Sequence, residues 1–246
     1  MRIAQPVRIL GHAWRREAAR CFSSSPVGII GDLRQIKTNE LKGDGTRLSD
    51  IVARSPHTYG IGMLDGMVGE VFIKNSTALN GWFDGMQYRL EEIAPDETVC
   101  FLAYAQVPEW RAVRVPGRVR TFADLEAFIG EAAAEAGFDP AGGEAVPVRL
   151  EAYANTLKWF IVNGAGNGAP DHLQSFFRQR VLGGLDDVEI DAVGLYSPAH
   201  KGIASNPNTA LHMHFITEST KEPFVGHLDD DLEIRSGSAT VFFPAS

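Results

Sequence analysis

Three histidines near the end of the chain have the residue type and the spacing of metal ligands. His212 and His214 are separated by one residue in the segment LHMHFI, and His227 follows a loop that contains Pro223. If LHMHFI is a β-strand, alternate side chains share a face, so the two histidines project together with Cα atoms about 6–7 Å apart. A hairpin return would bring His227 across from them. Three neutral imidazoles that leave one position open are typical of a catalytic zinc site, so we predict that they bind a divalent metal ion, with Zn²⁺ as the expected metal.

The other four histidines, His12, His57, His172 and His200, lack such neighbours. A histidine of this kind is more often a core or surface residue than a ligand, and this is also the alternative interpretation for the three predicted ligands. His200 lies two residues after Pro198 and is expected in a loop, from which it could support a metal ligand through a hydrogen bond.

The segments that would position these histidines have mainly the character of β-strands. After residue 25, stretches of β-branched and apolar residues recur between Gly, Pro and Asn. The predicted strand segments are 27–33, 58–75, 86–92, 98–106, 146–163 as a pair of strands, 191–197, 211–217, 232–236 and 239–243. A Gly/Asn-rich turn is expected at 163–171. Many strands and few helices predict an α+β fold with mixed, mainly antiparallel β-sheets, formed by a single unit over residues 26–246.

Two helices are predicted between these strands. Residues 46–54 (TRLSDIVAR) have apolar residues at helical spacing and end just before a Ser-Pro pair. Residues 121–136 give the clearest helical pattern, with Thr121 as the N-cap and Asp124 as the acid of a capping box. Gly137 follows directly and is expected to end this helix.

The composition excludes several classes of function. The 246 residues carry a net charge of -8, and residues 1–25 contain five arginines and one glutamate, so the rest of the chain is still more acidic. Such a surface repels a phosphate backbone, and nucleic-acid binding is not expected. The sequence has no run of about 18 uncharged apolar residues, so no membrane-spanning helix is predicted. Cys21 and Cys100 are too few for a disulfide framework, which favours a reducing compartment.

Residues 1–25 have a composition unlike the rest of the chain. They are rich in Arg and Ser and nearly free of acidic residues, with apolar residues interleaved, and these are traits of a transit peptide. The alternative is a basic arm that precedes the fold. A transit peptide would direct the protein to the mitochondrial matrix, whereas a simple arm is consistent with a cytoplasmic protein.

Several motifs resemble one known family. Around the histidines these motifs are GLYSPAHKGI (194–203), LHMHFIT (211–217) and GHLDDDLEI (226–234), and upstream lies GDGTRLSDIVARSPHTYGIGMLDGMVGEVFI (43–73). The first three resemble the C-terminal half of the bacterial α-acetolactate decarboxylases. The fourth is similar to the segment of that family in which a short helix precedes a glycine-rich strand. The resemblance runs from about Val27 to Phe242 and implies the fold of that family.

This resemblance implies a metal-dependent, non-oxidative decarboxylation. The family converts a 2-hydroxy-3-oxo acid, acetolactate, to a hydroxy ketone, acetoin, and CO₂. Carried over by position, His212, His214 and His227 match the three metal ligands, and Glu70 matches a glutamate near the metal. A metal ion chelated by hydroxyl and carbonyl oxygens stabilises the negative charge left when CO₂ departs. The implied partner is a small-molecule 2-hydroxy-3-oxo acid, and family analogy also implies a homodimer.

The sequence departs from the family where the substrate should be held. The catalytic arginine of the family falls at Phe160, within TLKWFIV (156–162). Lys158 or Arg149 could substitute for this arginine. Together with Glu70, Lys158 is our candidate catalytic residue, although a lysine cannot bind a carboxylate through two parallel donors as a guanidinium group does. A second family glutamate, beyond the last ligand, has no clear counterpart. The acidic run 229–231 is the candidate for its place, and a solvated turn is the alternative.

Three functions are therefore open. The first is a lyase of the acetolactate decarboxylase type. The second is a zinc-dependent ester hydrolase, in which Glu70 would act as general base. The third is a non-catalytic metal-binding homologue, in which Glu70 could be an ordinary solvated strand residue. Acetoin formed from acetolactate would identify the lyase, and cleavage of a chromogenic ester would identify the hydrolase.

Overall fold

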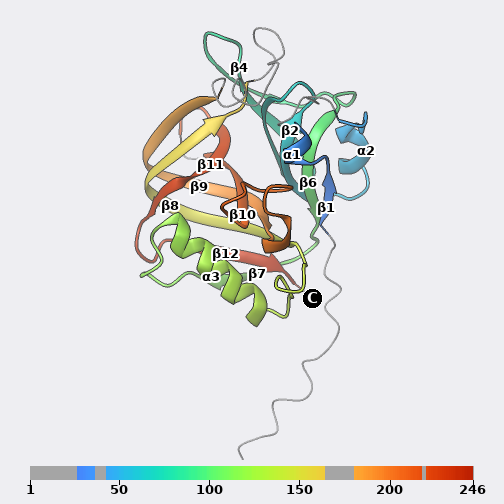
Figure 1. Cartoon of the computed structure of the whole chain (residues 1–246). Coiled ribbons are helices and arrows are strands. Elements are labelled where there is room, and N and C mark those ends of the chain that lie inside the picture. Colours follow the sequence, from blue (N-terminus) through green and yellow to red (C-terminus); the bar gives the residue numbers. More distant parts are fainter. Residues whose placement is uncertain (1–26, 37–42, 164–179, 218–219, 246) are drawn as a thin grey trace, which may run out of the picture.

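The computed structural model describes residues 27–36, 43–163, 180–217 and 220–245 (Figure 1). The arm predicted at 1–25, and the turn predicted at 163–171 apart from Asn163, lie outside these residues. Within the described chain, two six-stranded sheets carry most of the structure, and all their strand pairs are antiparallel. The predicted fold class is confirmed. None of the described helices is long and apolar enough to span a membrane.

The first sheet has the strand order β1-β6-β2-β3-β4-β5. Its strands are β1 (Gly28–Ile30), β2 (Thr58–Leu64), β3 (Val68–Lys74), β4 (Thr77–Phe83), β5 (Tyr88–Glu92) and β6 (Val99–Gln106). The short helices of this half of the chain are α1 (Leu33–Ile36) and α2 (Leu48–Val52). The glycines of β2 are required for close packing, since a Cβ atom at Gly62 would lie 2.2 Å from the carbonyl oxygen of Phe101. This explains the glycine-rich strand in the sequence.

The second sheet closes on itself. Its strands are β7 (Trp110–Arg114), β8 (Val146–Ile161), β9 (Val181–Tyr196), β10 (Leu211–Thr217), β11 (Phe224–Ile234) and β12 (Thr240–Pro244). β11 pairs with both β10 and β8, so β8, β9, β10 and β11 form a closed ring, while β12 and β7 extend from β8. Ring closure fixes the mutual register of these strands, although the first part of β9, Val181–Ile190, pairs with β8 alone.

Helix α3 (Phe122–Glu135) covers one end of this ring (Figure 1). Thr121 accepts a hydrogen bond from the Asp124 amide, and the Asp124 side chain accepts one from the Thr121 amide, so the predicted capping box is present. Leu125 and Ile129 are fully buried against the strands of the second sheet. The helix therefore begins where the sequence predicts and packs by its apolar face.

A second core joins the two sheets. It contains Met63 and Phe101 of the first sheet together with Val193 and Val225 of the second. Figure 1 shows the first sheet, blue to green, lying beside the second, yellow to red. Side chains at this junction come from strands far apart in the sequence, which is the arrangement needed to build a site from several elements.

The observed strands differ from the predicted ones in several places. β4 and β7 were not predicted, and β11 begins at Phe224, eight residues before the predicted strand 232–236. Residues 146–161 form one strand of 16 residues, where the sequence predicted two. β8 needs this length because its first half pairs with β12 and its second half with β11. β9 begins at Val181, ten residues earlier than predicted. The sequence did not predict its first ten residues because they are largely exposed and lack the apolar alternation that marks a half-buried strand.

Candidate metal centre

The three predicted ligands lie together on one hairpin. His212 and His214 are on β10, and His227 is on β11 directly opposite His214 in the strand register. Their ligand nitrogens all lie within 4.8 Å of one another. The spacing argument from the sequence therefore leads to the observed geometry, because cross-strand neighbours on one face of a sheet project in the same direction.

Backbone carbonyls fix the orientation of two of the rings. Nδ1 of His212 lies 2.6 Å from the carbonyl oxygen of Ala204, and Nδ1 of His214 lies 2.8 Å from that of Val71. A carbonyl oxygen only accepts hydrogen bonds, so each Nδ1 carries the proton and each Nε2 keeps its lone pair. This is the tautomer in which Nε2 binds a metal ion, and the carbonyls hold the rings as outer-shell partners commonly do.

The third ring is held by packing. His227 stacks on Phe160 of β8 with ring centroids 3.9 Å apart, and His212 faces Phe101 at 5.8 Å. The three imidazole centroids lie 4.8–5.2 Å from one another. Aromatic side chains from both sheets thus limit the rotation of the histidines.

Burial favours the neutral forms of His214 and His227. His214 is 1% exposed and His212 is 6% exposed. Burial lowers the pKa values of His214 and His227 well below the ordinary 6.5, and the neighbouring His212 adds to both shifts. Because a metal ion binds only the neutral imidazole, the lowered pKa values favour binding.

Glu70 on β3 lies beside the three histidines, in contact with His214. Its side chain is almost fully buried, so it is not a solvated strand residue. Oε1 accepts a hydrogen bond from the amide of Val162 at 2.8 Å, and Oε2 lies 3.1 Å from Nε2 of His214. Burial raises the pKa of Glu70 well above its ordinary value, while the Val162 amide and the charge of Arg180 act in the opposite direction.

The contact between Glu70 and His214 tests whether a metal ion suits this site. Nδ1 of His214 already carries the proton of that ring, so Nε2 and Oε2 face each other as two lone-pair atoms. Such a pair is stable only with a proton or a cation between or beside the two atoms. A divalent ion bound by the three histidines would supply that positive charge, so the donor set fits a metal ion.

Two charged residues that line the cavity, Arg180 and Glu126, were missed by sequence reasoning. Arg180 lines the same cavity, with its guanidinium carbon 4.8 Å from the centroid of Phe160. Its charge lowers the pKa of both Glu70 and His227. The signal that could have found it is the hairpin register: Ile161 pairs with Val181, which places the residue before β9 beside the end of β8.

The two cations predicted from the sequence do not reach the cavity. Lys158 is exposed, and its Nζ lies over Gly184 of β9 on the outside of the ring. Arg149 donates hydrogen bonds to both carboxylate oxygens of Asp191 at 2.9 and 2.8 Å. Lys158 shares a face of β8 with Phe160, which lines the cavity, but it lies two residues away at an exposed position and does not line the cavity. The expectation that Lys158 replaces the family arginine is corrected for this reason.

The acidic run 229–231 and His200, both singled out in the sequence, differ in whether they line the cavity. Of the acidic run 229–231, which lies within β11, Asp229 and Asp230 line the cavity and Asp231 does not. His200 accepts or donates a hydrogen bond with Ser197 at 2.7 Å and does not line the cavity. The carbonyl of Ala204, rather than His200, supports the nearest metal ligand.

The comparisons with known proteins concern the fold. No family model and no curated relative matches the sequence. Among solved structures, α-acetolactate decarboxylase from Bacillus subtilis superposes with a TM-score of 0.69 at 14% identity, covering 90% of this chain and 86% of that chain. Acetolactate decarboxylase from Bacillus subtilis subspecies spizizenii gives 0.69 at 15% identity, covering 90% and 87%.

A third structure extends the comparison. A Staphylococcus aureus protein of unknown function, described as similar to α-acetolactate decarboxylase, has a TM-score of 0.64 at 16% identity and covers 88% of this chain and 84% of that chain. Identities this low carry information on the fold alone. The chain thus has the fold of the α-acetolactate decarboxylases.

Proposed function

We propose that the protein is a metal-dependent decarboxylase of the acetolactate decarboxylase type, which converts a 2-hydroxy-3-oxo acid to a hydroxy ketone and CO₂. His212, His214 and His227 are the proposed metal ligands. The observation that carries the proposal is the buried group in which Glu70 Oε2 lies 3.1 Å from the ligating nitrogen of His214, at the base of a cavity. The decarboxylase fold supports it.

The metal ion would supply Lewis acidity toward the hydroxyl and carbonyl oxygens of the substrate. The reaction breaks the carbon–carbon bond to the carboxylate, releases CO₂ and requires a proton at the carbon left behind. Glu70 is placed to deliver that proton from Oε2, because the Val162 amide holds Oε1 and leaves Oε2 facing the predicted metal ligands.

Arg180 is the proposed anchor of the substrate carboxylate. Among the described residues that line the cavity it is the one basic side chain. A guanidinium group presents two parallel donors to a carboxylate, and stacking over Phe160 limits the orientations available to it. Arg180 takes the role that the sequence had given to Lys158.

The decisive experiment is an assay of acetoin formation from acetolactate by the full chain loaded with Zn²⁺. We expect activity that a chelator abolishes and that added metal restores. Arg180→Met should reduce kcat/KM by about 100-fold or more, the scale of a lost charged anchor. Lys158→Met is the matched control and should leave kcat/KM unchanged.

The same preparation separates the alternatives. Cleavage of a chromogenic ester without acetoin formation would replace the lyase by a hydrolase that uses Glu70 as general base. Bound zinc with neither activity would indicate a non-catalytic metal-binding protein. Metal content far below one ion per chain after loading would refute the metal centre itself.

A further inference from the structure

The cavity continues well beyond the predicted metal ligands. Its volume is about 380 Å³. Pockets of about 300–1,000 Å³ hold ligands of drug size, which are larger than the smallest 2-hydroxy-3-oxo acids. The metal ligands lie at the buried end, whereas Asn208 and Asp230 line the cavity as exposed residues. A substrate bound at the histidines would therefore have free space between its own side chain and the mouth.

The direction of this free space follows from the strand register. β10 and β11 are antiparallel, and His214 lies opposite His227. Moving back along β10 to Leu211 and forward along β11 to Leu228 leads away from the histidines in the same direction. Both residues line the cavity, and the two chains end at its rim with Asn208 and Asp230.

Apolar side chains form part of the wall of this outer region, beside the polar Asn206, Asn208 and Thr209. Leu211, Leu228 and Phe122 of α3 line it; at 1%, 2% and 5% exposed they are almost fully buried, and they belong to one packed core. These residues come from three elements. Apolar walls of this kind gain free energy by burying an apolar group of a ligand, and they offer no partner to a polar one.

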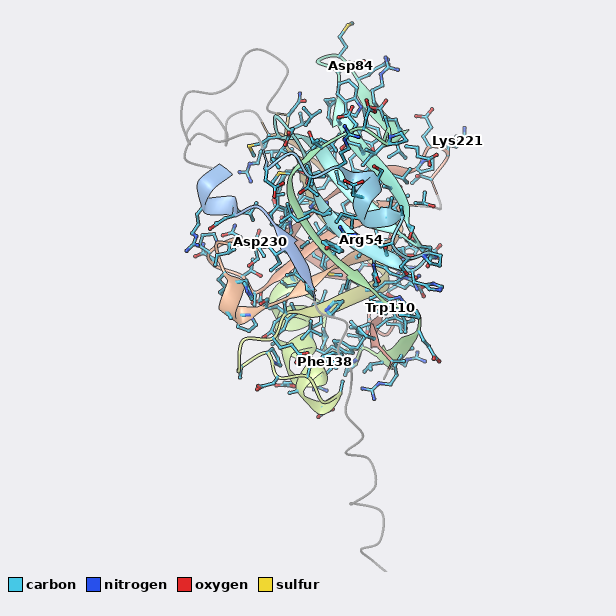
Figure 2. All side chains as sticks on the ribbon, turned by 90° about the vertical axis from the view of Figure 1, so that its right-hand side faces the viewer. Arg54, Asp84, Trp110, Phe138, Lys221 and Asp230 are labelled. Carbon is cyan, nitrogen blue, oxygen red and sulfur yellow. The ribbon has the colours of Figure 1, made fainter. Side chains whose placement is uncertain are left out.

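The mouth is acidic. Glu126, Asp229 and Asp230 line it, and Glu126 is fixed there because its carboxylate accepts hydrogen bonds from Thr209 Oγ1 at 2.5 Å and from the Ala210 amide at 2.9 Å. Figure 2 shows Asp230 on the side of the molecule that carries α1, whose Leu33 also lines the cavity. A second carboxylate on the distal end of a ligand would meet like charges here.

We propose that the substrate of this site carries, on its 2-hydroxy-3-oxo acid group, an apolar side chain of several carbons that lies against the part of the cavity lined by Leu211, Leu228 and Phe122 and bears no second carboxylate. The acid group is taken from the proposed function, on which this inference rests, while the side chain follows from the shape and charge of the outer cavity.

The test measures binding of unreactive 2-hydroxy acids to the zinc-loaded full chain by calorimetry. The probes are lactate, 2-hydroxyhexanoate, 2-hydroxyoctanoate and 2-hydroxyadipate. Burial of each further methylene should tighten binding by up to about fourfold until the cavity is filled. 2-Hydroxyadipate should bind at least about tenfold more weakly than 2-hydroxyhexanoate, because one added carboxylate faces the acidic mouth. Equal affinities for lactate and 2-hydroxyoctanoate would overturn the proposal.

Two variants of α3 locate the binding of the side chain. Ala123 is exposed and lines the cavity, whereas Ala127 is exposed on the same helix and does not line it. Ala123→Trp should fill the outer cavity. The preference of the protein for 2-hydroxyoctanoate over lactate, expressed as the ratio of their association constants, should then fall by at least about tenfold. Ala127→Trp should leave that ratio unchanged. Equal ratios in the two variants would place the side chain elsewhere and contradict the proposal.

The outcomes distinguish this inference from the proposed function. Binding that depends on chain length, in a protein that releases no CO₂, would support the apolar cavity and refute the decarboxylase. Acetoin formation together with affinities that do not change with chain length would support the decarboxylase and refute the apolar side chain of the substrate. Failure of all four acids to bind the zinc-loaded protein would refute both.

Discussion

At the scale of single residues, the orientation of the His212 and His214 rings is constrained most by the hydrogen bond that each Nδ1–H donates to a backbone carbonyl. Two backbone carbonyls hold these protons, so the lone pairs of both Nε2 atoms point to the same small region as His227. Side-chain substitution cannot remove these carbonyls. The orientation of the rings is therefore built into the backbone, and the affinity for metal depends on the histidines themselves.

Replacement of one ligand should abolish tight metal binding. We expect His212→Ala to raise the dissociation constant for zinc by more than about 100-fold, because loss of an outer-shell partner alone commonly costs about 10- to 100-fold. Competition with a chromogenic chelator measures the constant. His57→Ala is the control, since His57 lies apart from the three ligands. An unchanged constant for His212→Ala would show that zinc binds elsewhere.

Glu70 should make the metal-free protein less stable as the pH rises. Its folded pKa is raised above the ordinary 4.5, so its protonated form stabilises the fold at low pH and this stabilisation is lost as the pH increases. Glutamine at this position stays neutral and can donate a hydrogen bond to the lone pair on Nε2 of His214. Glu70→Gln should therefore be more stable than the wild type at pH 7.5, by about 1–3 kcal/mol, and equally stable at pH 4.

Urea unfolding in the presence of a chelator measures this difference at each pH. The exposed Glu92 on β5 provides the control, because Glu92→Gln should show no comparable dependence on pH. A Glu70→Gln advantage of the same size at both pH values would contradict the buried carboxylate as its cause. The same substitution should reduce decarboxylase activity, so stability and function oppose each other at this residue.

At the scale of elements, the sequence predicts best where periodicity and burial agree. The hairpin of β10 and β11 was predicted because the His-x-His alternation has a strand period and a turn follows it. The helix at 122–135 was predicted from its cap and its apolar face. Arg180 was missed because its place depends on the pairing of β8 with β9, a contact between segments whose connection has no strong pattern. Lys158 was misplaced because a motif match does not specify how far along a strand the cavity extends: Lys158 shares a face with Phe160 but lies beyond the cavity wall.

The capping box of α3 should contribute measurably to stability. Thr121→Ala removes the acceptor for the Asp124 amide and should lower the free energy of unfolding by about 1 kcal/mol, the usual value for an N-cap. Asp124→Ala should have a similar effect. Since both side chains belong to one box, the double variant should lose less than the sum of the two single losses, measured by urea unfolding. Strict additivity would show that the two caps act independently.

At the scale of the whole molecule, the candidate metal centre lies where the two sheets meet. The three histidines belong to the second sheet, whereas Glu70 and the carbonyl that holds His214 belong to β3 of the first. A metal ion at this junction would therefore stabilise the contact between the sheets as well as the hairpin that carries the ligands. The two sheets also share the apolar core around Phe101 and Val193, so they should unfold together.

Zinc should consequently stabilise the whole fold through binding linkage. At a free zinc concentration about 100 times the dissociation constant, the free energy of unfolding should rise by about 2.7 kcal/mol. Thermal unfolding at buffered zinc concentrations measures the rise, and His227→Ala should show none. Hydrogen exchange locates it: the amides of β3 should be protected by zinc together with those of β10 and β11. If zinc protects β10 and β11 while exchange in β3 is unchanged, the ion binds the hairpin without coupling the sheets. The interaction of Glu70 with the metal site would then be too weak for the catalytic role proposed for it.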